Sequence, residues 1–255
     1  MSAVAQPARR IPLAVPAAIA LAWVVAVAAE ASGAAAALHH DDLLEGGLPR
    51  WAALSLFLVS WQLMTAAMML PSSLPLVRLF WTTSQQPWAF AAFLGGYAVV
   101  WGAFGVAAFA GDGLLHELVH ALPALEERPW LVGGSVLVAA GAFQFTKLKE
   151  ACLDQCRHPG VFLMRKYRRG SDAAFRLGRD HGVFCLGCCW ALMLVMFAAG
   201  FANLAWMAVL AAVTAYEKIG RHGRRLTPVL GVALAGWGAV VLAHPGWLPT
   251  SLGGP

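Results

Sequence analysis

Long apolar runs recur along the 255 residues of this chain, and they constrain its fold more than any other feature. Seven can be delimited, at residues 11–31, 51–70, 88–110, 130–145, 183–200, 203–216 and 227–243. A helix of about 20 apolar residues crosses a hydrocarbon layer about 30 Å thick. Hydrophobic residues make up 60% of the chain and charged residues 12%, which is too apolar for a soluble protein of this size. The pattern predicts a membrane protein in which even the shorter fourth and sixth runs are spans.

The composition of these runs favours helices over a β-barrel. Ala, Leu, Val and Gly dominate them, without the alternation of period two that barrel strands show. We therefore expect an all-α, polytopic transmembrane helical bundle of about seven spans, forming a single domain over residues 1–255. Its one long connection is the basic loop 146–180. In that loop, residues 148–164 are predicted to form a helix broken near Pro159, and residues 167–179 to lie along the inner membrane surface.

The basic residues indicate the orientation of the bundle. With seven spans, all but two of the 18 Lys and Arg residues lie on the side of the amino terminus, the exceptions being Arg50 and Arg128. Positively charged loops face the cytoplasm. We therefore expect a multi-pass protein of the inner (plasma) membrane, with its amino terminus and the 146–180 loop in the cytoplasm and its carboxyl terminus outside.

The same charge pattern bears on the expected partners. Topology and anionic lipid headgroups account for the net charge of +5, so no nucleic-acid partner is expected. The lipid bilayer is the expected surrounding. The basic cytoplasmic loop is a candidate docking surface for a protein partner.

All five cysteines lie in two short clusters. Cys152 and Cys156 belong to the long loop, and Cys185, Cys188 and Cys189 begin the fifth apolar run. By the expected topology, every thiol lies on or near the reducing side of the membrane, where structural disulfides are rare. Spacings of three and four residues make these thiols candidate metal ligands.

Methionines extend this sulfur pattern. Cys185, Cys189 and Met193 follow one another at intervals of four residues, which places them on one face of a helix. Met64 and Met68 have the same spacing in the second run. At about 1.5 Å per residue, both sets fall in the cytoplasmic half of the bilayer. Each residue by itself is also a common packing residue, so the prediction depends on the pattern as a whole.

The identity of the metal depends on which donors dominate. Thiolates and thioethers favour Cu(I), whereas thiolates completed by imidazole also suit Zn²⁺. His158 and His181 flank the two cysteine clusters and could supply that imidazole. Four polar side chains could support the ligands by hydrogen bonds, or act simply as contacts between helices: Gln62, Gln144, Glu217 and Lys218.

Several stretches around these residues resemble a known family. They are residues 61–71 (WQLMTAAMMLP), 141–162 (GAFQFTKLKEACLDQCRHPGVF), 181–200 (HGVFCLGCCWALMLVMFAAG) and the pair Glu217-Lys218. The chain resembles, over roughly residues 50–243, an uncharacterised bacterial family of predicted metal-binding integral membrane proteins. The resemblance implies a metal site drawn from Met64, Met68, Cys152, Cys156, Cys185, Cys188, Cys189 and Met193. Phe143, where Tyr is expected, and Lys149, at a variable position, depart from the family pattern.

A different chemistry is indicated by the sequence HELVH at residues 116–120. On a helix, His116 and His120 would share a face and bind zinc, with Glu117 as general base. The motif falls in an external loop of the expected topology, and only Glu126 or Glu127 is available nearby as a third ligand. A second external group is better explained as a loop cap than as a metal site: His39, His40, Asp41, Asp42 and Glu45.

Three hypotheses follow. The main one is a non-enzymatic membrane protein that binds a soft metal ion, Cu(I) or else Zn²⁺, for metal handling or delivery. The second is a zinc-dependent membrane peptidase that uses His116, Glu117 and His120. The third is a structural or assembly partner without a metal, whose thiols would lie more than about 8 Å apart, too far to share an ion at about 2.3 Å each.

Overall fold

The computed structural model describes residues 12–34, 47–128, 130–198 and 204–244, and over these residues the chain is helical without a strand. The helices are α1 (Ala14–Ala31), α3 (Arg50–Ser84), α4 (Pro87–Ala121), α5 (Pro123–Glu126), α6 (Trp130–Phe143), α7 (Lys147–Arg157), α8 (Pro159–Lys166), α9 (Ser171–Ala198), α10 (Leu204–Ile219) and α11 (Gly223–Ala243). The predicted all-α class is confirmed.

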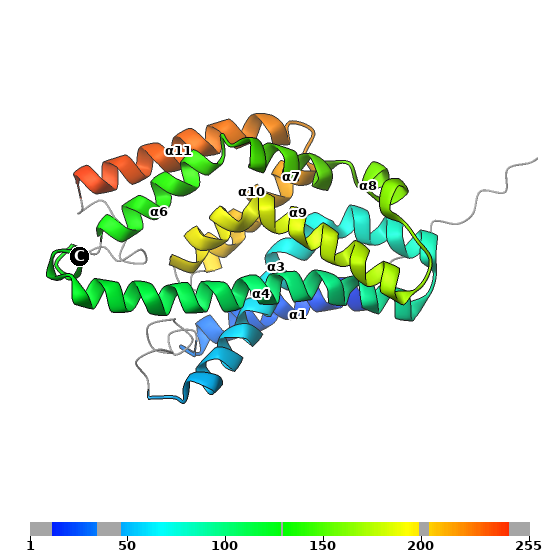
Figure 1. The fold of residues 1–255 in the computed structure, drawn as a ribbon, viewed down its shortest axis with the longest axis horizontal. Helices are drawn as coiled ribbons and strands as arrows, with labels where there is room; N and C mark the ends of the chain where they lie inside the picture. The colour runs from blue at the N-terminus through cyan, green and yellow to red at the C-terminus, as the bar shows by residue number, and fades with distance from the viewer. Residues whose placement is uncertain (1–11, 35–46, 129, 199–203, 245–255) are drawn as a thin grey trace, which may run out of the picture.

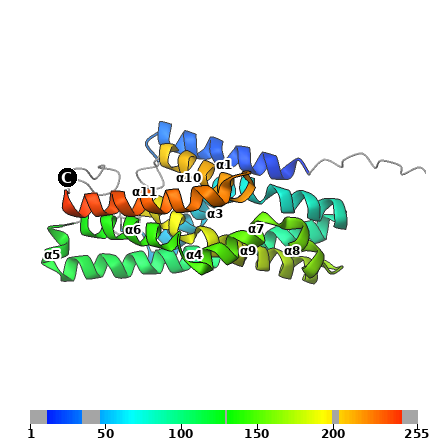
Figure 2. The ribbon, with the colours of Figure 1, turned by 90° about the horizontal axis from the view of Figure 1, so that it is seen from above.

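The helices form an elongated bundle in which α4 runs along the long axis (Figure 1). α9 packs along α4, and α11 packs along α6. Seen from above, α1 lies on one side of the bundle and α4 on the other (Figure 2). The short helices α7 and α8 connect α6 to α9, and α8 contacts α3. The long helices therefore enclose a core, and α7 packs against it through α9.

Five helices in the described part of the chain are long and apolar enough to cross a membrane: α1, α3, α4, residues 171–196 of α9, and α11. A sixth span results if α6 and α7, bent by 64° against each other, count as one. α6 has 14 residues and α10 has 16. At about 1.5 Å per residue, each is shorter than a hydrocarbon layer of about 30 Å. The number seven and the orientation therefore stay predictions.

α3 is longer than the apolar run that predicted it. The run ends at residue 70, whereas the helix continues through Pro71 and Pro75 to its end at Ser84. Prolines are tolerated in transmembrane helices where side chains satisfy the freed carbonyl groups. Pro71 has no N–H to donate to the Ala67 carbonyl one turn earlier, and the Trp23 indole of α1 donates to that carbonyl instead, at 3.2 Å. Arg78 consequently lies within a helix and not in a loop.

The stretch predicted as a long loop is mostly helical. Thr146 caps α7, its hydroxyl accepting from the Lys149 amide at 3.2 Å. The chain then breaks at His158, and Pro159 begins α8. Proline disfavours a helical conformation in the residue before it, which explains the break. The predicted helix with an interruption near Pro159 is confirmed.

Residues 171–179, expected along the membrane surface, instead form the first turns of α9. Small residues explain the difference. A Cβ atom on Gly178 would overlap the Phe93 carbonyl oxygen of α4, and one on Gly96 would overlap the Phe175 carbonyl oxygen. The two backbones are thus in direct contact, an arrangement that small residues permit between membrane helices. Ala174 is buried at the same contact. This packing draws the basic segment onto α4.

We predict that Gly178→Ala lowers the free energy of unfolding by about 1–3 kcal/mol, because the added methyl group forces α9 away from α4. Gly95→Ala is the matched control, since nothing lies within 4 Å of the position that its Cβ would take. Denaturant titration of the purified protein in detergent measures both. Equal stability of the two variants would contradict the proposed close contact.

Candidate metal centre

α9 carries three thiols and a thioether into the core of the bundle. Cys185, Cys188, Cys189 and Met193 are all buried, each with at most 1% of its surface exposed. They belong to one continuous apolar cluster that also contains Met64 and Met68 of α3. Cys185, Cys189 and Met193, which were predicted to share one face of a helix, are therefore buried together, and Cys188 is buried beside them.

Sulfur atoms from two helices approach one another. The Sγ atoms of Cys156 on α7 and Cys188 on α9 are 4.0 Å apart, and those of Cys188 and Cys189 are 3.4 Å apart. Two sulfur atoms that bind one ion at about 2.3 Å each lie at most about 4.6 Å apart. Both separations fit that limit. They are also well below the distance of about 8 Å expected if the thiols only packed.

Cys152 brings α7 against α9 at a second point. Its thiol is buried and lies against the backbone of Gly187, where a Cβ atom would be only 2.5 Å from Sγ. Glycine at this position lets the two helices approach. The close approach holds both α7 thiols beside the thiols of α9.

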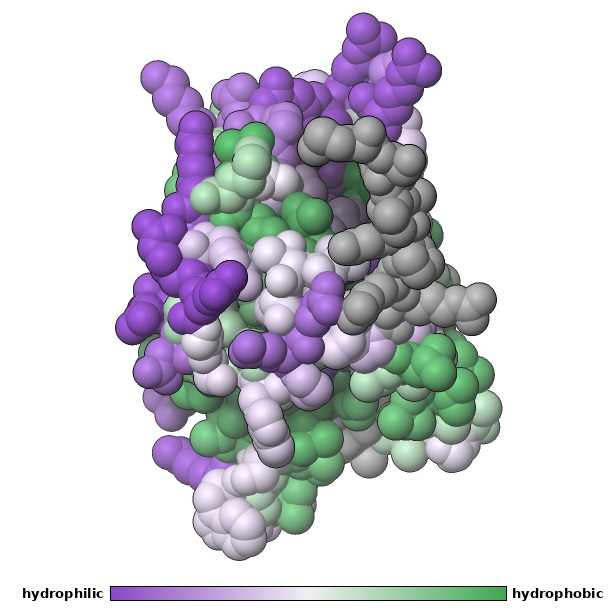
Figure 3. Space-filling model, turned by 90° about the vertical axis from the view of Figure 1, so that its right-hand side faces the viewer, coloured by the Kyte–Doolittle hydropathy of each residue, from purple (hydrophilic) through white to green (hydrophobic). Residues whose placement is uncertain are grey.

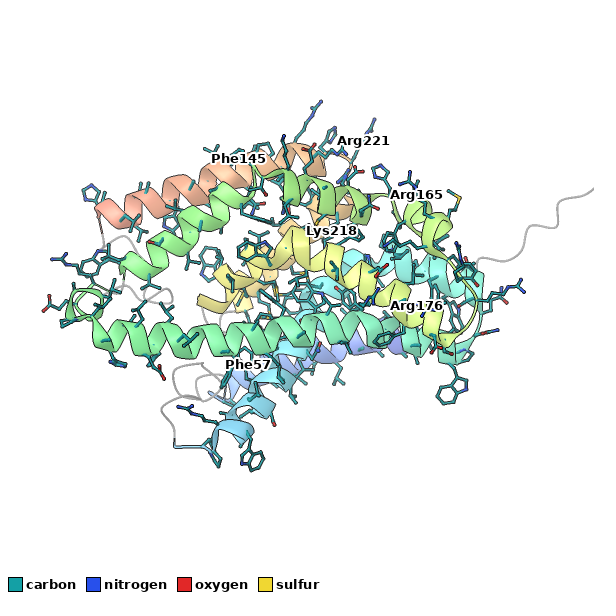
Figure 4. All side chains as sticks on the ribbon, in the orientation of Figure 1. Phe57, Phe145, Arg165, Arg176, Lys218 and Arg221 are labelled. Carbon is teal, nitrogen blue, oxygen red and sulfur yellow. The ribbon has the colours of Figure 1, made fainter. Side chains whose placement is uncertain are left out.

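Lys218 reaches the same cluster from α10. Its side chain is only 4% exposed, and its Nζ donates to the Cys185 Sγ atom and to the Ser72 hydroxyl, each at 3.1 Å. Among the described residues, no carboxylate lies within salt-bridge distance of Lys218. Figure 4 shows Lys218 enclosed by helices, whereas Arg221 lies at the edge of the molecule.

The preceding residue, Glu217, forms an ion pair with a different lysine, Lys149. Its carboxylate accepts from Lys149 Nζ on α7 at 2.8 Å, and both side chains are 1% exposed. The Thr227 hydroxyl of α11 donates to the same carboxylate at 2.9 Å. Arg157, at the end of α7, donates to the carbonyl groups of Glu217 and Gly220. These bonds fix α7, and with it Cys152 and Cys156, to the ends of α10 and α11.

The two histidines predicted as ligands differ in their surroundings. His181 is buried, its Nε2 is 3.1 Å from the Ser73 hydroxyl, and its ring stacks on Tyr97. The Tyr97 hydroxyl lies 3.1 Å from Cys185 Sγ, so His181 lies next to the thiol cluster. His158 is 54% exposed, and its Nδ1 is 2.9 Å from the Asp154 carbonyl oxygen. The structure thus places His158 at the surface, apart from the buried cluster.

The two glutamines bond to backbone carbonyl groups. Gln62 donates to Ala98 at 2.8 Å, which joins α3 to α4, and Gln144 donates to Ala140 at 3.0 Å, one turn earlier in the chain. Neither glutamine donates to a sulfur atom in these bonds. The bonds fit the role of helix contacts, and not the role of supporting the metal ligands.

No three His, Cys, Asp or Glu side chains in the described part of the chain already surround a common point. The thiols form a row, with one sulfur following another at 4.0 and 3.4 Å. Rotation about the Cα–Cβ bond moves a thiol by more than an ångström, so a row can become a ligand set without movement of the helices.

The HELVH sequence lies in the last turns of α4, and not in an external loop as expected. The rings of His116 and His120 do share a face, with centroids 5.0 Å apart. Glu117 is exposed beside them. Among the described residues, no third His, Cys, Asp or Glu side chain joins this pair in a group that could hold a metal ion. The cluster at His39 to Asp42, with Glu45, lies outside those residues.

Sequence reasoning missed several polar groups of the cluster. Tyr97, Ser72 and Ser73 contact Cys185, Lys218 and His181. Lys149, treated as a variable position, is instead buried in an ion pair. One available signal was that each of these residues carries a hydroxyl or ammonium group within or beside an apolar segment, where unpaired polar groups are costly.

In a comparison with protein families, a family model described as PpoB2, copper chaperone, matches residues 58–241 of this chain. The matched region includes every residue of the cluster from Met64 to Lys218. No curated protein and no solved structure matches the chain.

The buried ion pair generates a stability prediction. Glu217→Gln should lower the free energy of unfolding by about 3–5 kcal/mol, because it leaves the Lys149 ammonium buried without a partner. The double variant Lys149→Met/Glu217→Leu should recover most of this loss. Asp180→Asn is the control, since its partly exposed pair with Lys166 contributes at most about 1 kcal/mol. A Glu217→Gln protein as stable as Asp180→Asn would contradict the assigned role.

Proposed function

Because this chain belongs to the copper chaperone family, we propose that it binds Cu(I) as cargo through the sulfur atoms between α7, α9 and α3. The ligands would be drawn from Cys156, Cys188, Cys189 and Cys185, with Cys152, Met64, Met68 and Met193 adjacent. The chain would hold the ion for delivery and would not act as an enzyme.

The buried ammonium of Lys218 is the observation that carries this proposal. An unpaired charge in an apolar interior is strongly destabilising. Lys218 has a thiol and a hydroxyl as its hydrogen-bond partners, and no carboxylate among the described residues. One Cu(I) ion bound by two or three thiolates carries a net charge of −1 or −2. Such a centre at Cys185 and its neighbours would supply the negative charge that Lys218 lacks.

The donors favour Cu(I) over Zn²⁺. Thioethers and thiolates are soft ligands that suit Cu(I), whereas Zn²⁺ sites with thiolates commonly add imidazole. The thioethers of Met64, Met68 and Met193 are buried in the cluster, while His158 is at the surface and His181 is bonded to Ser73. Neither the family match nor the described residues support the peptidase hypothesis.

The proposed setting is the inner membrane, with seven spans, a cytoplasmic amino terminus and an external carboxyl terminus. Two observations support it: the apolar helices suited to crossing a bilayer, and the concentration of basic residues at the α7 and α8 end. The thiols would then lie near the cytoplasmic surface, within reach of a partner that docks on residues 146–180.

Copper content gives the first test. Purified wild-type protein exposed to Cu(I) should retain about one ion per chain or more, and replacement of Cys185, Cys188 and Cys189 by Ser should abolish this, because the thiolate donors are lost. Met207→Leu is the control, since Met207 is buried in the same core but lies outside the proposed ligand set. Equal copper content in the wild-type and triple-serine proteins, measured by mass spectrometry, would exclude the proposal.

Lys218 gives a second test. Lys218→Met should leave the copper-free protein at least as stable as the wild type, because a buried charge is removed. It should weaken Cu(I) binding about tenfold or more, or ~1.4 kcal/mol, because the anionic centre loses its counter-charge. Competition with a chromogenic Cu(I) chelator measures the affinity. Arg221→Met, at the exposed turn after α10, should bind as the wild type does.

A further inference from the structure

We infer that Cu(I) is exchanged at Cys156 with a small anionic thiol carrier of the cytoplasm. The inference rests on the proposed function and names the thiol through which the cargo passes and the chemistry of its carrier. It follows from the exposure of the five thiols, their order in the row and the charge around the outer one.

Exposure singles out Cys156. All five cysteines lie in the described residues, and Cys156 alone is partly exposed while the other four are buried. An incoming ligand must reach the metal before the outgoing ligand leaves. A carrier can therefore approach this row of thiols only at Cys156. The break at the exposed residue His158, two positions later, keeps the chain from continuing over that end of α7 as a helix.

The row of sulfur atoms continues inward from this point. Cys156 is 4.0 Å from Cys188, and Cys188 is 3.4 Å from Cys189. Cys185 follows one turn earlier on α9, with Lys218 beside it. An ion bound first at Cys156 can thus pass to buried thiols by successive exchange, without becoming free at any step.

The exchange balances without a change of oxidation state. A Cu–S bond to the carrier breaks, and a Cu–S bond to Cys156 forms. The Cys156 thiol loses its proton, and the released carrier thiolate takes up a proton. Copper stays Cu(I) throughout, so the step needs no oxidant or reductant.

The surroundings of Cys156 favour an anionic carrier. Arg157 donates to the Gly220 carbonyl, which brings the turn between α10 and α11 against the end of α7. That turn carries the exposed Arg221, and the exposed Arg225 lies in the first turn of α11. Asp154, the nearby carboxylate on α7, is already paired with Arg224. Figure 3, viewed from the α8 end, shows hydrophilic residues gathered along the upper edge, where Figure 1 places α7 and this turn.

The partial burial of Cys156 favours a small carrier. Its side chain is neither fully covered nor exposed, and it lies between α7 and α9. A thiol on a flexible tripeptide can reach such a position. Glutathione, which has two carboxylates and one ammonium group, combines this size with net negative charge and is the probe of choice.

The test measures the rate of copper transfer to the full-length protein in detergent from Cu(I)–glutathione and from Cu(I) bound to the diethyl ester of glutathione. The ester has the same thiol without the carboxylate charges. At low salt we expect loading from glutathione to be faster than loading from the ester, by about tenfold or more. In about 0.5 M salt this difference should disappear, because salt screens the attraction between the exposed charges.

Variants separate the role of the thiol from that of the charge. Cys156→Ser should slow copper loading about tenfold or more. The variant should still bind copper in the end, through the buried thiols of α9. Arg221→Gln/Arg225→Gln should slow loading from glutathione and leave loading from the ester unchanged. The matched pair Arg50→Gln/Arg128→Gln removes two exposed charges elsewhere and should load as the wild type does.

The outcomes distinguish this inference from the proposed function. If the wild-type protein retains no copper from either donor and none in the copper-content test, the proposed function fails. If it retains copper but Cys156→Ser loads at the wild-type rate, or the ester is as good a donor as glutathione, this inference alone is overturned. Loading only from a folded thiol protein, and from neither small thiol, would also overturn it.

Discussion

A positive charge enclosed in an apolar bundle needs a negative charge near it, and Lys218 is such a charge at the centre of the structure. The neighbouring carboxylate of Glu217 does not supply that negative charge. The two residues are adjacent on α10 and project about 100° apart, so Glu217 pairs with Lys149 on α7 while Lys218 turns to Cys185 and Ser72. Carboxylate and ammonium thus serve different partners. One fastens α7 to α10, and the other brings a cation to the thiols.

Close helix packing places the thiols where this charge can act on them. Gly96 and Gly178 allow α4 and α9 to meet backbone to backbone, and Gly187 allows Cys152 of α7 to lie against α9. In lipid, the hydrophobic effect gives little drive for helices to associate, so such contacts between small residues and interhelical hydrogen bonds carry more of the stability. The same small residues that hold the bundle together therefore determine the distance between α7 and α9.

The sequence predicted the helices better than their lengths and contacts. Apolar runs locate α1, α3, α4, α9 and α11, the described helices that are long and apolar enough to cross a membrane. They could not show that α3 continues through Pro71 and Pro75, since a proline ends most helices in water. Nor could they show that residues 171–179 extend α9, because that depends on one glycine contact with a residue 85 positions away, Phe93.

The sulfur cluster was predictable in part for a similar reason. Spacing of four residues predicts a shared helix face, and Cys185, Cys189 and Met193, which have this spacing, are buried in one cluster. Spacing cannot reveal which residue of another helix lies opposite. The roles of Tyr97, Ser72 and Lys149 are set by the crossing of helices distant in sequence, and so they emerged only from the structure.

X-ray absorption at the copper edge of the Cu(I)-loaded protein tests the central claim most directly, because it reports the atoms bound to the metal. The account predicts a first shell of sulfur atoms alone at about 2.3 Å, as for other metal thiolates, with no imidazole scattering. A shell made of nitrogen or oxygen, or one with sulfur that persists unchanged when Cys185, Cys188 and Cys189 are Ser, would contradict it.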